Sequence, residues 1–232
     1  MPFVLSDMTV LTQSNSQTDA TSYDTASITP TANRMVYLAV YGAGSSIGTV
    51  SLVGNGITWT QEETQLGGTS SRISLFRGFH ATPSTGAITI TWTTTVVRCA
   101  WAVFELANND TTTPVVQSVP GSGTNVTTLS ITLAAFGSAD NATLGLFGIN
   151  KNEAITPGTG FTEIAEQVAS TESMALQVEW RIDNDTGVDA SWATNTNDPV
   201  GIACELTYAA AASGKAPVHI FQRQNRVWTI RR

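Results

Sequence analysis

Gly44-Ser45-Ser46-Ile47-Gly48 is a short pattern that could take part in catalysis, because it fits the G-x-S-x-G signature of a serine nucleophile. That signature needs a helix directly after the serine and a histidine base later in the chain. A strand-like run follows residues 44–48, and the two histidines are His80, in another strand-like run, and His219, near the C-terminus. We therefore interpret residues 44–48 as a turn and predict no catalytic residue.

The acidic segment Asp183-Asn184-Asp185-Thr186-Gly187-Val188-Asp189 is similar to the start of a calcium-binding loop. The twelfth position of such a loop supplies a bidentate carboxylate, and Thr194 stands there instead. A turn between two strands accounts for the same residues, with a weak calcium site as the alternative. Cys99 and Cys204 lie in apolar runs with no zinc-binding spacing, so we predict two buried thiols, with a disulfide as the alternative, and no metal or cofactor.

Glu105 and Glu205 each end an otherwise apolar run, at equivalent places in the two halves of the chain. Two carboxylates that face one cleft can hydrolyse glycosidic bonds. We favour a structural interpretation, in which each carboxylate pairs with an arginine such as Arg77 or Arg181. Most of the six tryptophans lie in phase with aliphatic residues and are predicted to be core. The exceptions are Trp59 and Trp228, which lies near the C-terminus, and they give a weak indication of a carbohydrate-binding platform.

The composition and the hydrophobic pattern predict an all-β protein. Hydrophobic residues make up 41% of the 232 residues and charged residues only 12%, and Thr, Ser, Gly, Val and Ile are abundant. Residues 87–95 and 174–182 alternate between apolar and polar, whereas residues 35–41 and 97–106 are apolar on both faces. We predict a two-sheet antiparallel β-sandwich, jelly-roll-like, made in a cytosol, because no secretory signal or membrane-spanning run is visible.

A repeated motif predicts that this sandwich contains two similar halves. Gly54-Asn55-Gly56-Ile57-Thr58-Trp59 returns as Gly158-Thr159-Gly160-Phe161-Thr162-Glu163, each before matching strand-like runs. Tyr41-Gly42 aligns with Phe147-Gly148 in the same order. The predicted organisation is an N-terminal arm or first strand (1–24), a sandwich (25–212) with halves at about 25–110 and 125–210, and a C-terminal arm (213–232).

The charge is divided unevenly along the chain. Residues 1–214 hold all 18 acidic and six of the 11 basic residues, which gives 6 − 18 = −12, and the last 18 residues hold five basic residues and no acid. An acidic body argues against nucleic acid as the partner. The basic end is predicted either to fold back as an extra strand or to bind neighbouring subunits. The predicted partner-binding residues are Arg223, Arg226, Trp228, Arg231, Arg232 and, in the body, Trp59.

The order of these runs resembles jelly-roll-like β-sandwich proteins of tailed bacteriophages. The resemblance covers about residues 25–210 and rests on the apolar strand 35–41, the G-x-G-[IF]-T motif, the strand 72–80 and the run Ala-Trp-Ala-Val-Phe-Glu-Leu at 100–106. It implies a non-enzymatic, homo-oligomeric virion protein without membrane or nucleic-acid contacts. Such a protein would bind the major capsid protein or other virion subunits as a capsid decoration (cement) protein. A carbohydrate- or receptor-binding module of a tail fibre or tail protein is the alternative.

Overall fold

The computed structural model describes residues 2–171 and 173–209, and almost all of its regular structure is β-strand. A 3-10 turn, η1 (Leu5–Asp7), precedes the strands. The strands are β1 (Met8–Ser16), β2 (Ala20–Asp24), β3 (Met35–Ala43), β4 (Val50–Gly54), β5 (Thr58–Gly67), β6 (Ser71–Phe79), β7 (Ile88–Val96), β8 (Arg98–Leu106), β9 (Val115–Thr132), β10 (Ala142–Ile149), β11 (Thr156–Pro157), β12 (Thr162–Ala169), β13 (Met174–Arg181) and β14 (Gly187–Leu206). The all-β antiparallel sandwich is confirmed.

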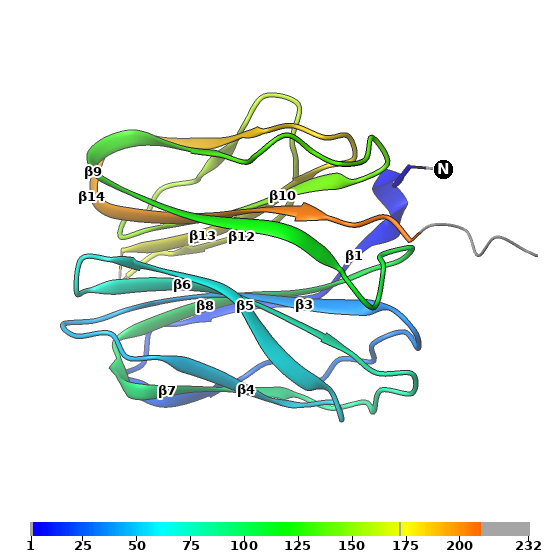
Figure 1. Ribbon diagram of the computed structural model, residues 1–232. Coiled ribbons are helices and arrows are strands. Elements are labelled where there is room, and N and C mark those ends of the chain that lie inside the picture. The colour runs from blue at the N-terminus through cyan, green and yellow to red at the C-terminus, as the bar shows by residue number, and fades with distance from the viewer. Residues whose placement is uncertain (1, 172, 210–232) are drawn as a thin grey trace, which may run out of the picture.

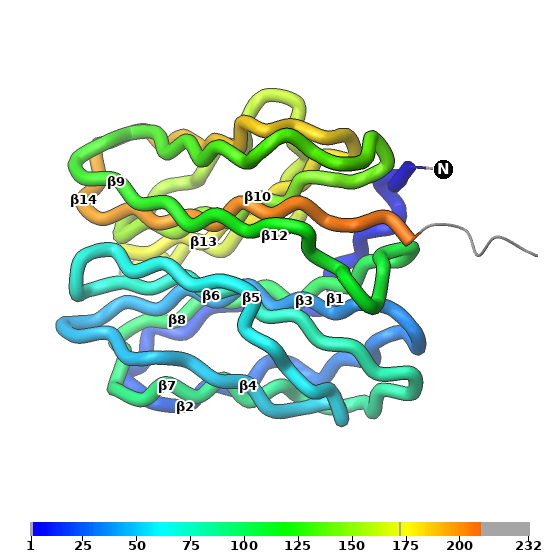
Figure 2. The backbone as a smooth tube through the Cα atoms, viewed as in Figure 1, coloured from blue at the N-terminus to red at the C-terminus, as the bar shows by residue number. Residues whose placement is uncertain are grey.

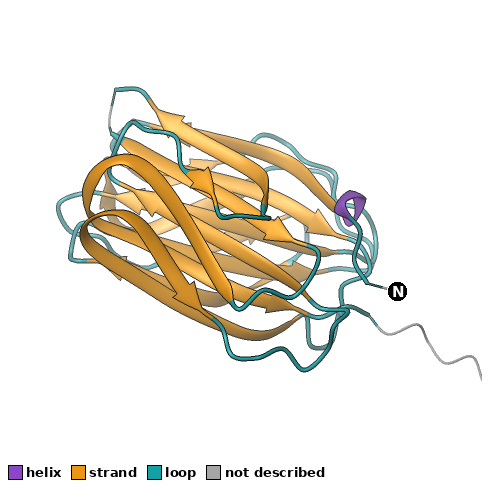
Figure 3. Cartoon of the chain, turned by 90° about the horizontal axis from the view of Figure 1, so that it is seen from above, coloured by secondary structure: helices purple, strands orange, loops and turns teal. Residues whose placement is uncertain are grey.

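Hydrogen bonding divides these strands among three sheets, where the sequence predicted two. The outer sheet has the order β2-β7-β4, and the middle sheet has the order β1-β8-β3-β6-β5. The large sheet has the order β11-β14-β10-β13-β12, and β9 also pairs with β14. Figures 1 and 2 show these strands stacked in layers, with β7 and β4 below, β8 and β3 in the middle and β10 and β13 above. Figure 3 shows the loops gathered at the ends of the strands.

The large sheet bends so that its long strands contribute to two layers. β9 and β14 pair along almost their whole lengths, and the register between them shifts between Ser191 and Val200. In the first half of the chain, β7 and β8 instead belong to different sheets. They are separated at Val97, whose N–H donates to the carbonyl oxygen of Ala43 at 2.9 Å. In the second half, the single long strand β14 takes the place of β7 and β8, so the two layers of this half belong to one hydrogen-bonded sheet.

The order of pairing is the same in the two halves. β3 lies between β8 and β6, as β10 lies between β14 and β13. An origin of this similarity by duplication stays a prediction. The alignment of Tyr41-Gly42 with Phe147-Gly148 is wrong by one residue. Tyr41 packs between the halves, whereas Phe147 packs inside the second half, and a strand slipped by one residue turns every side chain to the other face.

Three hydrophobic clusters account for the predicted core residues. The central cluster lies between the middle and large sheets and contains Tyr41 and Trp180, and each half has its own cluster, with Trp92 in the first and Trp192 in the second. Every residue of β3 and of β10 is buried, because both strands lie between two clusters. The apolar character of both faces follows from this position. Within residues 2–171 and 173–209, no helix has the length and hydropathy needed to cross a bilayer.

Candidate functional site

The first copy of the repeated motif forms a corner between two sheets. It joins β4 of the outer sheet to β5 of the middle sheet. The N–H of Ile57 donates to the carbonyl oxygen of Gly54 at 3.1 Å, and the two central residues, Asn55 and Gly56, have φ values of 57° and 67°. Positive φ at both positions is typical of a type I′ turn, which requires glycine or asparagine. The Asn55 amide donates to the carbonyl oxygens of Ser84 and Gly86 and holds the corner against the next loop.

The second copy forms the equivalent corner, between β11 and β12, with a different turn. The N–H of Phe161 donates to the carbonyl oxygen of Gly158 at 3.0 Å, and Gly160 alone of the turn has positive φ, at 85°. The N–H of Gly158 donates to Glu179 Oε2 at 3.0 Å. A Cβ added at Gly160 would lie 2.9 Å from Nη1 of Arg181. This turn therefore packs against the polar end of β13, and we call the two together the polar corner.

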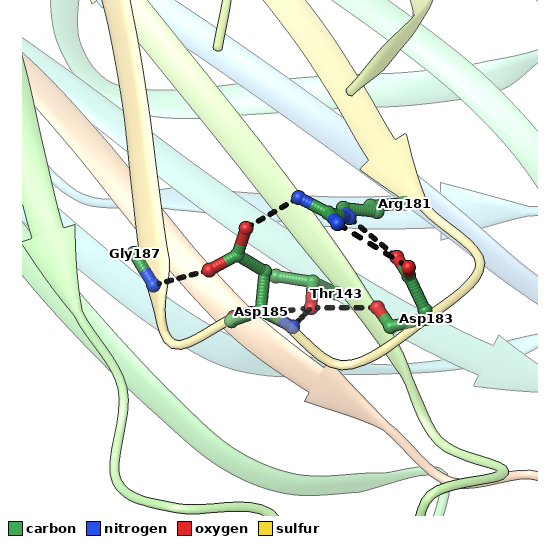
Figure 4. Close-up of polar contacts among 5 residues, drawn as sticks. All are labelled: Thr143, Arg181, Asp183, Asp185 and Gly187. Carbon is green, nitrogen blue, oxygen red and sulfur yellow. Dashed lines mark hydrogen bonds and ion pairs between the residues drawn. The ribbon is translucent and has the colours of Figure 1, made fainter. Parts of the chain in front are cut away.

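Arg181 holds the acidic loop that follows β13, as Figure 4 shows. Its Nη1 donates to Asp185 Oδ2 at 2.5 Å, and its Nε and Nη2 donate to the carboxylate of Asp183. These bonds lower the pKa of Asp183 and raise that of Arg181. Thr143 accepts from the N–H of Asp185 at 2.9 Å, and Gly187 donates to the other oxygen of Asp185. The guanidinium of Arg181 is therefore the cation of this loop, and it already bonds the carboxylates of Asp183 and Asp185 that a calcium ion would need.

The prediction of a turn at residues 183–189 fits this geometry. A calcium loop needs several oxygen ligands that converge on one point. Among the described residues, no three His, Cys, Asp or Glu side chains are arranged to hold a metal ion.

Glu179 is the most unusual titratable group of the polar corner, because it is fully buried in the second half. Its Oε2 accepts from Gly158 and from the amide of Gln177, while its Oε1 and the Gln177 Oε1 have no hydrogen-bond partner among the described residues. Burial, with smaller contributions from the charges of Asp189 and Glu163, raises the pKa of Glu179 to about 7, against the lowering effect of the hydrogen bonds from Gln177 and Gly158. A pKa near neutrality suits a general acid or base, but a fully buried carboxylate cannot touch a substrate.

Glu105 and Glu205 are both buried, and Glu105 pairs with an arginine as predicted, but that arginine is Arg34 and not Arg77 or Arg181. Glu105 accepts from the N–H and hydroxyl of Thr31, each at 2.7 Å, and from Arg34 at 3.0 Å. Arg77 bonds to Glu62 instead. Glu105 is paired with Val36, and Arg77 with the next residue along β3, so the two side chains project from opposite faces of the middle sheet.

Glu205 is held by amides. It accepts from Gln117 Nε2 at 2.7 Å and from Asn141 Nδ2 at 2.6 Å. Asn141 in turn accepts from the N–H of Tyr208. The predicted partner Arg181 is bonded to the acidic loop after β13. Both glutamates therefore tie the loops at the ends of central strands to the sheets, and neither faces a cleft with the other.

Trp59 is half-buried and packs against the hydrophobic cluster of the first half, so it is not an open aromatic platform. Its indole N–H has no hydrogen-bond partner among the described residues. Its counterpart Glu163 is exposed, and partial burial together with the charge of Glu166 raises the pKa of Glu163. The other predicted partner-binding residues lie outside the described part of the chain: Arg223, Arg226, Trp228, Arg231 and Arg232.

Cys99 and Cys204 are confirmed as free, buried cysteines. Burial raises the pKa of the Cys99 thiol to about 12 and that of the Cys204 thiol well above its ordinary value. Neither thiol is therefore ionised at neutral pH, and neither is a nucleophile.

Comparisons of this chain with models of protein families, with curated proteins and with solved structures found no match. Sequence reasoning missed the buried glutamate of the polar corner. The alternation in residues 174–182 placed Gln177 and Glu179 on a polar face, and a polar face is ordinarily exposed. Gly145 on the neighbouring strand leaves room for Glu179, because a Cβ there would lie 3.0 Å from Glu179 Oε1. The sequence signal that could have revealed the buried glutamate is therefore Gly145, which lies opposite Glu179 in the register of β10 and β13.

Proposed function

We propose that this protein is a capsid decoration protein of a tailed bacteriophage, which binds the assembled shell through its basic C-terminal segment (residues 215–232). The observation that carries the proposal is the division of charge. The body is a β-sandwich with a formal charge of −12, and the last 18 residues have a charge of +5. Five cations with no acid among them are suited to carboxylates on another subunit, where arginine forms paired hydrogen bonds.

The described part of the chain ends shortly after β14, beside the loop that follows β8. The last described residue, Ala209, follows β14, and its N–H donates to the carbonyl oxygen of Asn108 at 2.7 Å. An extended segment of 18 residues can reach roughly 60 Å, which is enough to cross from one subunit to the next. A protein that binds only the assembled shell stabilises it by mass action, by about 2.7 kcal/mol at a concentration 100 times the Kd.

Three edge strands of the body support a role as a repeated, non-aggregating unit. β1, β5 and β12 each carry a register shift: between Val10 and Thr12, between Gln61 and Glu63, and between Glu163 and Ala165. Such bulges twist an edge and discourage unwanted pairing with another chain. A protein displayed in many copies on one particle needs this protection, because its local concentration is high.

Immunogold labelling tests the proposal directly. Antibodies raised against residues 2–209 are applied to virions and empty capsids purified from the source culture. Labelling over the capsid surface is expected. Labelling confined to tails would support the receptor-binding alternative, and purified particles without label would refute a virion role.

A binding experiment then tests the basic segment. Purified protein is added to capsids that lack it, and the bound fraction is measured by co-sedimentation at 50 and 200 mM salt. The variant Arg223→Ser/Arg226→Ser/Arg231→Ser/Arg232→Ser should bind at least tenfold more weakly than the wild type, while Lys151→Ser, which removes a cation from the body, should bind normally. Equal binding of the two variants would contradict the assigned role of residues 215–232.

A further inference from the structure

β4 differs from the other edge strands of the sandwich. It is the last strand of the outer sheet and pairs only with β7, and its register runs without a shift from Val50 to Gly54. β1, β5 and β12 are bulged, and β2 has a register shift between Ala20 and Ser22. β9 also has register shifts against β14, and β11 consists of two residues, one of which is a proline. A regular edge with unpaired backbone groups is a template for a strand of another chain.

The hydrogen bonds between β4 and β7 fix which backbone groups of β4 face outward. The N–H of Thr93 donates to the carbonyl oxygen of Thr49 at 2.9 Å, so this is a hydrogen-bonded pair. Such pairs alternate along an antiparallel ladder, so Ser51 and Val53 also bond toward β7. The N–H and C=O groups of Val50 and Leu52 therefore point away from the sheet. The side chains of both residues are already buried in the core, at 7% and 8% exposure, so a new strand could pair without repacking them.

The charge distribution indicates which chain could approach this edge. No charged residue occurs between Arg34 and Glu62, a stretch that includes all of β4. β7 has no charged residue either. By contrast, β5 contains Glu62 and Glu63. Two acidic bodies repel each other least where both are neutral, so the β4 edge is where a second copy of the chain can come close.

The solvent-exposed side chains of β4 also suit a second copy of the chain. Val53 is 72% exposed, the largest exposure among the exposed large hydrophobic residues of the described chain. Ser51 is also exposed, and its partner Thr91 on β7 presents a further exposed hydroxyl. This face is uncharged and carries one apolar side chain beside the free edge, so a neighbouring strand would cover Val53.

We propose that β4 pairs antiparallel with β4 of a second copy across a two-fold axis at Leu52. The two outer sheets of three strands each then form one continuous sheet of six. Leu52 lies opposite Leu52 of the second copy, and Ser51 lies opposite Val53 of the second copy. The dimer depends on the body alone and does not require shell binding by residues 215–232.

A charge-pair experiment tests both the edge and its register. Ser51 and Val53 are exposed, so charged side chains at these positions leave the core intact. In the variant Ser51→Lys/Val53→Lys, like charges lie directly opposite each other. In the variant Ser51→Lys/Val53→Glu, each new lysine lies opposite a new glutamate of the second copy. Thr91→Lys is the control, because it adds a cation to the same face on the central strand of the outer sheet.

Sedimentation velocity of the full chain measures the mass, which is 24.5 kDa for a monomer. We expect a dimer for the wild type and for the Lys/Glu variant, and a Kd at least tenfold higher for the Lys/Lys variant, with Thr91→Lys close to the wild type. A monomeric wild type, or a dimer that responds equally to the Lys/Lys and Lys/Glu variants, would overturn the proposal. Hydrogen exchange provides the second measurement, since the Val50 and Leu52 amides should become protected as concentration rises.

Discussion

The substitution Glu179→Gln should stabilise the protein above pH 7. Glu179 is buried, and its pKa is raised from 4.5 to about 7, mainly by desolvation. Between these two pH values the folded state binds more protons than the unfolded state, so the free energy of unfolding falls as pH rises through this window. The contribution of neutral Glu179 is fully present below pH 4.5 and is lost above about pH 7.

The size of the effect follows from the shift. An increase in the pKa of Glu179 from 4.5 to about 7 corresponds to about 3 kcal/mol in the free energy of unfolding, since each pH unit corresponds to about 1.4 kcal/mol. Glutamine cannot ionise, and its Oε1 can still accept the N–H of Gly158, which Glu179 accepts at 3.0 Å. The variant should therefore match the wild type near pH 4.5 and exceed it by about 3 kcal/mol at pH 8.

Urea unfolding at half-unit steps from pH 4.5 to 8.5 measures this difference. Glu163→Gln is the matched control, because Glu163 lies opposite Glu179 in the register of β12 and β13 but is exposed. The control should change the pH profile much less. A difference between Glu179→Gln and the wild type that stays constant over the whole pH range would refute the reasoning, because it would show that Glu179 does not titrate there.

Three further predictions concern packing, the first corner and the acidic loop. Gly42→Ala should destabilise the protein by about 1–3 kcal/mol in urea unfolding, because the new Cβ would lie 2.5 Å from the ring of Trp92, whereas Gly86→Ala has no neighbour within 4 Å and should cost less than 1 kcal/mol. Asn55→Ala should lower stability by about 2 kcal/mol, because it removes two hydrogen bonds and places alanine at positive φ. Millimolar calcium should leave the Tm unchanged, since Arg181 already bonds the carboxylates of the acidic loop, and a rise of several degrees would contradict this.

The strands were predictable because the two kinds of hydrophobic pattern correspond to two positions in the fold. Residues 35–41 are apolar on both faces and form β3, which lies between two clusters. The alternation around Trp92 and Trp180 placed both side chains in the core correctly. These patterns depend only on local burial, which each strand carries in its own residues.

The partners of the charged residues were not predictable in the same way. Alternation separates two faces of a strand but does not say which of them another layer will cover, so the polar face that contains Glu179 was not expected to be buried. The pairing of Glu105 with Arg34 depends on the register between strands and on a loop that folds over the strand end. The free edge of β4 likewise follows from the order of strands in the outer sheet, which no single segment encodes.

The position of β14 has a mechanical consequence. Its C-terminal part lies between β9 and β10, bonded to both, with Leu206 opposite Val115 on one side and Ala142 on the other. A load transmitted along residues that follow β14 would pull it parallel to its own axis. Both ladders would then be loaded in shear, and many hydrogen bonds would have to break together before the strand could slip. An edge strand would instead be peeled away one bond at a time. Within the described residues, β14 is therefore a strand suited to bear tension along its axis.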